Sequence, residues 1–188
     1  MPSHVWYAAY GSNLSPERFD RYLSGGRPEG AVRTYAGCRN TAAPSDRRPT
    51  SLPGRVFFGA ASQVWGAGMA FYDPAAPGPS YATAYRLTVE QFADVWSQEC
   101  HRPPGASLPV ADIAERGSWL GGSGHYDRIL RVGSLDAEPV LTFTFAGSSP
   151  AANPPAPAYA ATIERGLVAT HGLSAAAAAA HVAGLSAT

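Results

Sequence analysis

The feature that most constrains this chain is an apolar strand that stops at a glycine-containing turn and leads directly into a helix. Val5 to Tyr10 is a run of β-branched and aromatic residues, which is typical of a buried strand. The next three residues, Gly11-Ser12-Asn13, favour a tight turn. Ser15 followed by Pro16 has the form of an N-cap and a first helical residue, so we predict a helix to about Leu23. The chain therefore opens as strand, tight loop and helix.

The rest of the sequence alternates between strand and helix patterns. Further strands are predicted at about 55–60, 67–72, 81–87, 125–132 and 140–145, with a possible strand at 32–35 inside the loop-rich stretch 24–54. Helices are predicted at about 89–99, at 158–170 and from Ser174 onward, where the alanine run favours helix. Residues 102–122 are expected to form an irregular excursion. The pattern predicts one mixed α and β domain over residues 1–188.

The charged residues exclude several classes of chemistry. All 14 basic residues are arginines, so the lysine that P-loop, Schiff-base and Ser-Lys enzymes need is absent. With 14 acidic residues the formal charge is zero, which gives no electrostatic reason to expect a nucleic acid or an anionic membrane as partner.

The N-terminus and the cysteines indicate an ordinary intracellular environment. The first residues show no basic segment followed by an apolar run, and no stretch approaches the roughly 20 apolar residues that span a bilayer. Cys38 and Cys100 are far apart and are expected to be reduced. The expected location is the cytoplasm.

The helix predicted from Thr88 directs one acidic residue inward. Thr88 and Gln91 have the form of a capping box. Phe92, Trp96 and Glu99 follow at helical spacing, so Glu99 should share the core-facing stripe, whereas Glu90 and Asp94 should be solvated. An inward carboxylate near a helix C-terminus is suited to act as a general base and then a general acid. From geometry alone, pairing with an arginine or a position at a frayed helix end explains Glu99 equally well.

The loop Tyr10-Gly11-Ser12-Asn13-Leu14 is a second candidate. A glycine-containing turn before a helix presents backbone N–H groups that suit a carboxylate or an oxyanion. An ordinary strand-to-helix turn is the simpler interpretation from composition alone. Tyr126 and Tyr159 are further candidates, although most tyrosines are half-buried structural residues. Tyr159 follows the rigid, proline-rich residues 153–157.

Other motifs fail. Residues 121–125 lack the closing glycine of a nucleophile elbow. The five histidines show no pair at metal-ligand spacing, so no metal site is expected, and His171 and His181 should lie on the surface.

These segments together resemble the γ-glutamylcyclotransferase family. Tyr10-Gly11-Ser12-Asn13-Leu14 after an apolar strand resembles the opening signature of that family. Tyr85-Arg86-Leu87 and the helix ending in Gln98-Glu99 resemble its strand-then-helix unit, which delivers the catalytic glutamate. Residues 154–159 resemble a late proline-rich segment ending in the pocket tyrosine Tyr159, and Tyr126 lies where another pocket tyrosine is expected. The resemblance covers residues 5 to 185 in the right order, although 102–122 and 40–54 look longer or differently composed.

The resemblance implies an α+β fold, with a compact mixed β-sheet that approaches a closed barrel and is flanked by helices. It also implies a cofactor-independent and metal-independent reaction in which the α-amine of a γ-glutamyl group attacks its own γ-amide, releasing 5-oxoproline and an amine. Glu99 would be catalytic. The substrate, a small molecule with a γ-glutamyl or related amide group, would be bound by Tyr10, Gly11, Ser12, Asn13, Leu14, Tyr126 and Tyr159.

Two alternatives keep the same fold. The chain could act on another amide or amine in specialised metabolism, an alternative that the long segment 102–122, expected beside the pocket, motivates. Whether 102–122 acts as a lid stays open. It could also be a small-molecule binding module without catalysis. The sequence specifies neither the amine released nor the oligomeric state.

Overall fold

The computed structural model describes residues 2–27, 34–121 and 124–186. The strands are β1 His4–Ala9, β2 Asp46–Leu52, β3 Arg55–Gly59, β4 Met69–Asp73, β5 Ser80–Thr88, β6 Ser118–Leu120, β7 Arg128–Leu135 and β8 Glu138–Thr144. The helices are the 3-10 turn η1 Ser12–Leu14, α1 Pro16–Ser24, α2 Val89–Glu99, α3 Val110–Arg116, α4 Pro157–His171 and α5 Ala175–Leu185.

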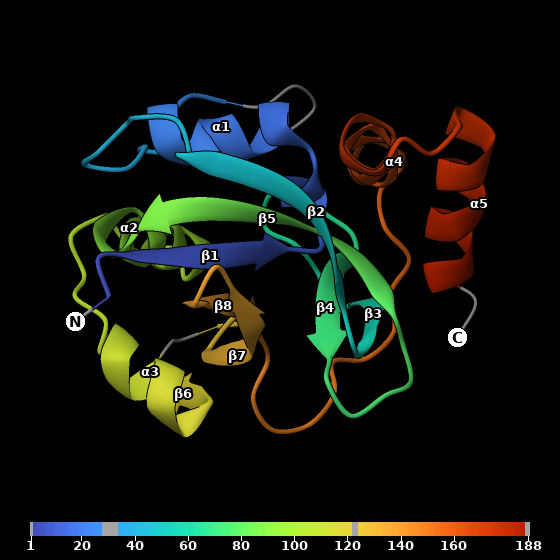
Figure 1. The fold of residues 1–188 in the computed structure, drawn as a ribbon. Coiled ribbons are helices and arrows are strands. Elements are labelled where there is room, and N and C mark those ends of the chain that lie inside the picture. The colour runs from blue at the N-terminus through green and yellow to red at the C-terminus, as the bar shows by residue number, and fades with distance from the viewer. Residues whose placement is uncertain (1, 28–33, 122–123, 187–188) are drawn as a thin grey trace.

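A mixed sheet forms the centre of the fold. Its six strands have the order β2-β5-β1-β8-β7-β6, and β1 is antiparallel to β5 but parallel to β8. β3 and β4 form a separate two-stranded sheet. Figure 1 shows α4 and α5 together at one end of the molecule, α3 and β6 toward the other, and α2 behind β1 and β5. The predicted α+β class is therefore confirmed, with a sheet that stays open between β2 and β6.

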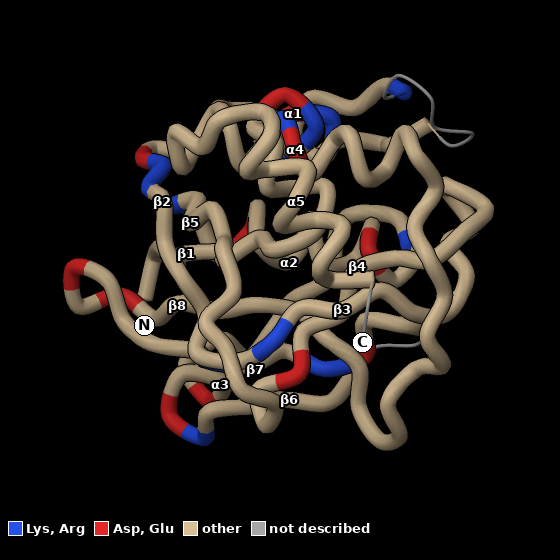
Figure 2. The backbone as a smooth tube through the Cα atoms, turned by 90° about the vertical axis from the view of Figure 1, so that its right-hand side faces the viewer, with Lys and Arg blue, Asp and Glu red and all other residues tan. Residues whose placement is uncertain are grey.

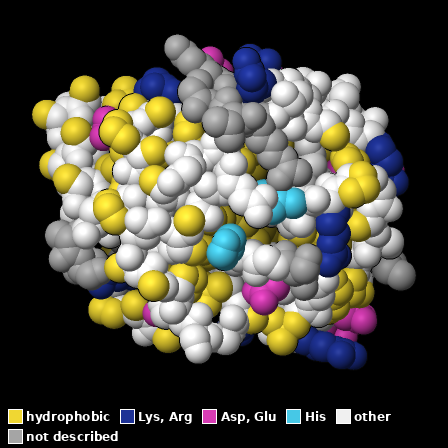
Figure 3. All heavy atoms as spheres, turned by 180° about the vertical axis from the view of Figure 1, so that it is seen from behind, with side chains coloured by type: hydrophobic (Ala, Val, Ile, Leu, Met, Phe, Trp, Pro, Cys, Tyr) yellow, Lys and Arg dark blue, Asp and Glu magenta, His cyan; other side chains and the backbone are white. Residues whose placement is uncertain are grey.

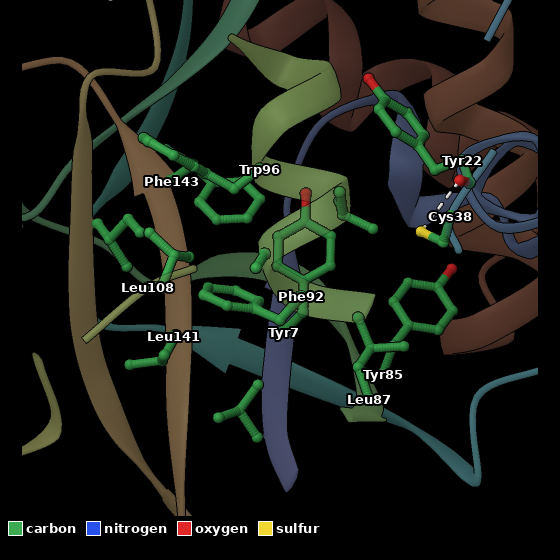
Figure 4. Packing of buried hydrophobic residues seen from close by; sticks show 14 of the residues in the cluster. Tyr7, Tyr22, Cys38, Tyr85, Leu87, Phe92, Trp96, Leu108, Leu141 and Phe143 are labelled. Atoms are coloured by element: carbon green, nitrogen blue, oxygen red, sulfur yellow. Dashed lines mark hydrogen bonds between the residues drawn. The ribbon is translucent and has the colours of Figure 1, made fainter. Parts of the chain in front are cut away.

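The central strand β1 is covered on both faces. Side chains alternate across a strand, so Val5, Tyr7 and Ala9 enter one apolar cluster while Trp6 and Ala8 enter another. Figure 4 shows part of the first cluster, which also contains side chains from α2 and β8. A strand buried on both faces gives its C-terminal end a fixed position, and the opening loop starts there.

Local sequence signals fix the helices beside this loop. Ser15 caps α1 by accepting a hydrogen bond from the Arg18 N–H, and Pro16 is the first helical residue. The capping box of α2 is present, with Thr88 and Gln91 each accepting from the other's backbone N–H at 3.1 Å. α4 approaches the opening loop so closely that a Cβ on Gly166 would lie 2.5 Å from the Ser15 nitrogen. Only glycine at position 166 permits this contact between α4 and the opening loop.

Three sequence predictions about secondary structure were wrong. Residues 46–52 pair with β5 along their whole length, although their alternate side chains are exposed and mostly polar, as befits an edge strand. Residues 110–116 form a helix within the expected excursion, because Val110 and Ile113 bury their side chains. The strand predicted from residue 125 begins at Arg128. Of the possible strand 32–35, residues 32 and 33 lie outside the described part, and Tyr35 makes only an isolated bridge to Gly26.

Asp94 and two histidines also depart from expectation. Asp94 is fully buried, because it accepts hydrogen bonds from the Arg39 side chain and from the backbone N–H groups of Arg39 and Gly105. The rings of His171 and His181 both pack on Tyr81 and are partly buried. A buried carboxylate with several donors is stable where an unpaired one would not be.

Most charged residues lie around the periphery, with both signs interspersed (Figure 2), whereas Arg18 and Asp94 are buried. Cys38 and Cys100 are both buried. None of the helices in the described residues has the length and apolar character that crossing a bilayer requires.

Candidate functional site

A pocket lies where the end of β1, η1, α1, the end of α2 and the start of α4 meet. Its cavity volume is about 60 Å³, and the space inside its walls is about 690 Å³ when the open solvent at its mouth is included. Its lining comprises Tyr7, Tyr10, Gly11, Ser12, Asn13, Arg18, Tyr22, Tyr35, Ser62, Gln63, Val64, Trp65, Met69, Gln98, Glu99, His101, His125, Tyr126, Phe143 and Tyr159. Figure 3 shows a face of the molecule on which two histidine side chains lie beside a depression with apolar side chains at its base. The pocket thus joins segments from both halves of the chain.

Glu99 and Asn13 meet in this pocket. The Asn13 Nδ2 group donates a hydrogen bond to Glu99 Oε1 at 3.1 Å and lies 3.4 Å from the Tyr7 hydroxyl. The backbone carbonyl of Asn13 accepts from the Tyr85 hydroxyl at 2.8 Å, which fixes the loop against β5. The Glu99 carboxylate is therefore oriented by the loop that follows β1.

The environment of Glu99 makes it a weaker acid than an exposed glutamate. Burial raises the pKa of Glu99 above its ordinary value of 4.5. Hydrogen bonding from the Tyr22 hydroxyl, the positive charge of Arg18 and the Asn13 amide act in the opposite direction without reversing the shift. A carboxyl group in this state can both accept and return a proton at moderate pH.

The opening loop leaves few backbone donors for a ligand. The Leu14 N–H is bonded to the Gly11 carbonyl at 2.9 Å, and the Ser12 N–H is directed at the Tyr159 hydroxyl. In the described part of the protein, the N–H groups of Gly11 and Asn13 have no acceptor. Leu14 itself is 2% exposed and belongs to the apolar core, so the structure places it outside the lining of the pocket.

Tyr126 and Tyr159 lie on the pocket wall and hold one residue of β4 between them. The Tyr159 hydroxyl accepts from the Ala70 N–H at 3.1 Å, and the Tyr126 hydroxyl donates to the Ala70 carbonyl at 2.7 Å. Burial raises the pKa of Tyr159 to about 12, so this phenol stays protonated at physiological pH. A Cβ on Gly11 would lie 3.0 Å from the Tyr159 hydroxyl, which explains the need for a small residue there.

Tyr10 is bonded to the neighbouring strand β8. Its hydroxyl donates to the Phe143 carbonyl at 2.6 Å, and both residues line the pocket. The structure thus brings Tyr10, Gly11, Ser12, Asn13, Glu99, Tyr126 and Tyr159 to one pocket.

Sequence reasoning missed the polar wall formed by Arg18, Tyr22 and Tyr35. Arg18 and Tyr22 are four residues apart on α1, so they share the helix face that also carries buried Phe19, and this spacing was a usable signal. Conversely, none of the described residues of 102–121 lines the pocket, contrary to expectation. Leu108 and Val110 instead contribute to the core.

Metal-ligand geometry is not found in the described ranges: they contain no group of three or more His, Cys, Asp or Glu side chains placed to hold a metal ion.

Comparison with solved structures classifies the architecture. A γ-glutamyl cyclotransferase superposes on 98% of this chain and 87% of its own length, with a TM-score of 0.54 and 16% identity. The chain has the γ-glutamylcyclotransferase fold. An uncharacterized protein from Homo sapiens shows the same similarity, covering 99% of this chain and 88% of its own at a TM-score of 0.55 and 17% identity. At these identities the similarity establishes the fold and not the reaction.

Sequence comparison adds one relative of different size. No family model matches the chain. Histone deacetylase 5 of Arabidopsis thaliana is 35% identical over 184 residues, an alignment that covers 87% of this chain. The chain spans only 28% of the length of that protein, so the plant protein's name describes a much longer polypeptide.

Proposed function

We propose that this protein is a γ-glutamylcyclotransferase-like enzyme that converts a γ-glutamyl amide into 5-oxoproline and a free amine. The observation that carries the proposal is the hydrogen bond between Asn13 and Glu99 inside a pocket of this fold. A carboxylate with a raised pKa, backed by a loop with free backbone N–H groups, has the two functions that such a reaction needs.

The reaction is an intramolecular acyl transfer. The substrate α-nitrogen forms a bond to the γ-carbonyl carbon, and the bond from that carbon to the departing nitrogen breaks. The α-ammonium loses one proton before attack, and the same nitrogen loses a second proton to solvent as the lactam forms. The departing nitrogen gains one proton as its bond breaks and a second from solvent, leaving as an ammonium, so protons balance. Because both partners belong to one molecule, holding the ring-closing conformation supplies much of the acceleration.

Glu99 is assigned both proton transfers. Its ionised form takes the proton from the α-ammonium and its protonated form gives the proton to the departing amine. The hydrogen bond from Asn13 keeps one carboxylate oxygen fixed during both steps. The Gly11 and Asn13 N–H groups would then stabilise the oxyanion that develops on the γ-carbonyl or hold a substrate carboxylate.

The decisive experiment is incubation of the purified protein with a panel of γ-glutamyl amines and dipeptides, followed by mass spectrometry of 5-oxoproline. We expect 5-oxoproline and the free amine in equal amounts from at least one compound. Ligand-induced thermal stabilisation without product from any compound would overturn the proposal in favour of a binding module.

A further inference from the structure

One wall of the pocket is apolar and comes mainly from the segment between β3 and β4. Val64, Trp65, Met69 and Tyr126 line this part of the cavity, and we call these four residues the outer wall. Val64 is 6% exposed, and the other three are partly buried. Large apolar side chains that face a cavity offer a ligand a surface to cover.

Hydrogen bonds within the segment fix the shape of the outer wall. The Ser62 hydroxyl accepts from the backbone N–H groups of Val64 at 3.1 Å and Trp65 at 3.2 Å. The Ser62 N–H donates to the Ala67 carbonyl at 2.7 Å. The Trp65 ring packs on the Tyr159 ring, with ring centres 5.4 Å apart. A ligand would therefore meet a preformed surface, which limits the side-chain entropy lost on binding.

The outer wall offers a ligand no formal charge. Among the described residues that line the pocket, Arg18 and Glu99 are the only ones of the Arg, Lys, Asp and Glu types. Arg18 belongs to α1, where its Nη2 group donates to the Tyr35 hydroxyl at 2.7 Å. His101 and His125 line the pocket but are exposed, so a carboxylate beside either would gain little from pairing in water.

The opening loop connects the outer wall to Glu99. A Cβ on Gly11 would lie 3.0 Å from the hydroxyl of Tyr159, the residue on which Trp65 packs. At the other end of the loop, the Asn13 amide donates to Glu99 at 3.1 Å. A carbonyl group held at this loop therefore has Glu99 on one side and the outer wall on the other. With the attacking amine beside Glu99, the departing amine is directed toward the outer wall.

We propose that the outer wall binds the departing amine, and that the compounds cleaved are γ-glutamyl derivatives of apolar amines that carry no carboxylate. This inference rests on the proposed function for the γ-glutamyl end and adds the class of amine released. A departing amino acid or peptide would place its carboxylate against apolar side chains with no guanidinium to pair with, and burial of an unpaired charge is costly. An aromatic or branched alkyl group would instead bury apolar surface against Trp65.

Three γ-glutamyl compounds that differ at one position test the assignment. γ-Glutamyl-phenethylamine has a hydrogen where γ-glutamyl-phenylalanine has a carboxylate and γ-glutamyl-phenylalaninamide has a neutral carboxamide. With the whole protein, we expect kcat/KM for 5-oxoproline formation to be at least about tenfold higher for the phenethylamine compound than for the phenylalanine compound, with the carboxamide between them. Equal values, or a higher value for the phenylalanine compound, would overturn the proposal.

Substitutions at Gln63 change the charge beside the outer wall at an exposed position of the lining. Gln63→Arg supplies the cation that the wall lacks and should narrow the preference for the phenethylamine compound by about twofold to fivefold. Gln63→Glu should widen the preference, because its charge repels a carboxylate. The same preference in both variants would show that no part of the departing amine lies at this wall, and would overturn the proposal even if substitutions of buried wall residues do not fold.

Trp65→Ala removes apolar surface from the wall. It should raise KM for γ-glutamyl-phenethylamine about tenfold and change KM for γ-glutamyl-methylamine much less, because a methyl group offers little apolar surface. Tyr81→Ala, which truncates a partly buried aromatic residue of β5 outside the pocket lining, is the matched control and should affect both compounds alike. An equal effect of Trp65→Ala on the two compounds would contradict a role for Trp65 in binding the amine.

Failure of this inference is distinguishable from failure of the proposed function. If no 5-oxoproline forms, calorimetry with the unaltered protein still measures whether the phenethylamine compound binds more tightly than the phenylalanine compound. Tighter binding that Trp65→Ala removes, without product, would retain the amine subsite and reject the reaction. Formation of 5-oxoproline at equal rates from all three compounds would retain the reaction and reject the subsite.

Discussion

Asn13 and Glu99 are 86 positions apart in sequence, yet the Asn13 amide nitrogen lies 3.1 Å from a carboxylate oxygen of Glu99. Asn13 lies in the turn η1 that follows β1, and Glu99 is the last residue of α2. Their contact places a partly buried carboxylate beside backbone N–H groups, and the proposed reaction depends on that arrangement.

Replacing Glu99 by glutamine should remove activity without removing the fold. The variant keeps the size and a hydrogen-bonding group but cannot take a proton, so 5-oxoproline formation should fall by about 10²–10⁴-fold. Steady-state kinetics and circular dichroism measure the two properties. Glu90→Gln on the same helix, where the side chain is exposed, is the matched control and should keep its rate. Near-normal turnover by Glu99→Gln would refute the role of Glu99.

The same variant should be more stable than the unaltered protein at high pH. Burial raises the pKa of Glu99 above 4.5 in the folded state, so the folded state favours the protonated form. The corresponding stability is complete below the unfolded pKa and is lost as pH rises through the raised folded pKa. Urea unfolding of both proteins at acidic and mildly alkaline pH should show the advantage of Glu99→Gln only at the higher pH. An advantage that is independent of pH would contradict the assignment of this titration to Glu99.

Removing the Asn13 side chain should move the pH profile of the enzyme. The Asn13 amide lowers the pKa of Glu99, so Asn13→Ala should raise that pKa and shift the acid limb of kcat/KM to higher pH. The rate should be lost first on the acidic side, where more Glu99 would be protonated. Asn40→Ala, at a half-buried loop position outside the pocket lining, should leave the profile unchanged. A lower rate at every pH with an unshifted acid limb would instead indicate a purely structural effect.

The two tyrosines that bind Ala70 should each contribute to stability. Tyr159→Phe leaves the Ala70 N–H without its acceptor, and Tyr126→Phe leaves the Ala70 carbonyl without its donor. A buried polar group without a partner costs about 1–3 kcal/mol, so urea unfolding should show a loss of that size for each. The loss should be larger for Tyr159, whose side chain is only 3% exposed. A change below a few tenths of a kcal/mol would mean that water replaces the phenol.

Two glycine-to-alanine substitutions should have opposite effects. In Gly166→Ala the new methyl group would lie 2.5 Å from the Ser15 nitrogen and 2.6 Å from the Leu14 carbonyl carbon, so either α4 or the opening loop must move. Overpacking of this kind costs about 1–3 kcal/mol. Gly184→Ala in α5 meets nothing within 4 Å and should stabilise the helix by about 1 kcal/mol. Thermal unfolding of the two variants checks the contrast, and destabilisation of both would show that α5 carries a constraint of its own.

Much of the fold could be predicted because its signals are local. The first strand, the N-cap Ser15 and the capping box at Thr88 each depend on neighbouring residues, and the structure contains all three, with β1 ending at Ala9. The edge strand β2 could not be predicted, because its polar alternating residues gain strand conformation only from pairing with β5. Asp94 was misplaced for a similar reason. Helical spacing says which face a residue occupies, but not that Arg39 and Gly105 will bring donors to it.

Only part of the candidate site could be predicted from local sequence patterns. The inward direction of Glu99 follows from its spacing to Phe92 and Trp96, and the pocket contains it. Arg18 donates a hydrogen bond to Tyr35, which lies 17 residues later in a loop, and no helical or strand periodicity relates the two positions. The side chain of Leu14 belongs to the apolar core, which the motif alone does not reveal.

The close contact between α4 and the opening loop has a consequence for how the protein is made. Tyr159 and Gly166 are synthesised after Asn13 and Glu99, yet Tyr159 lines the cavity and Gly166 lies against Ser15. The pocket can therefore be completed only after α4 has been synthesised, and a nascent polypeptide that stops short of Pro157 would expose the apolar surface that α4 covers.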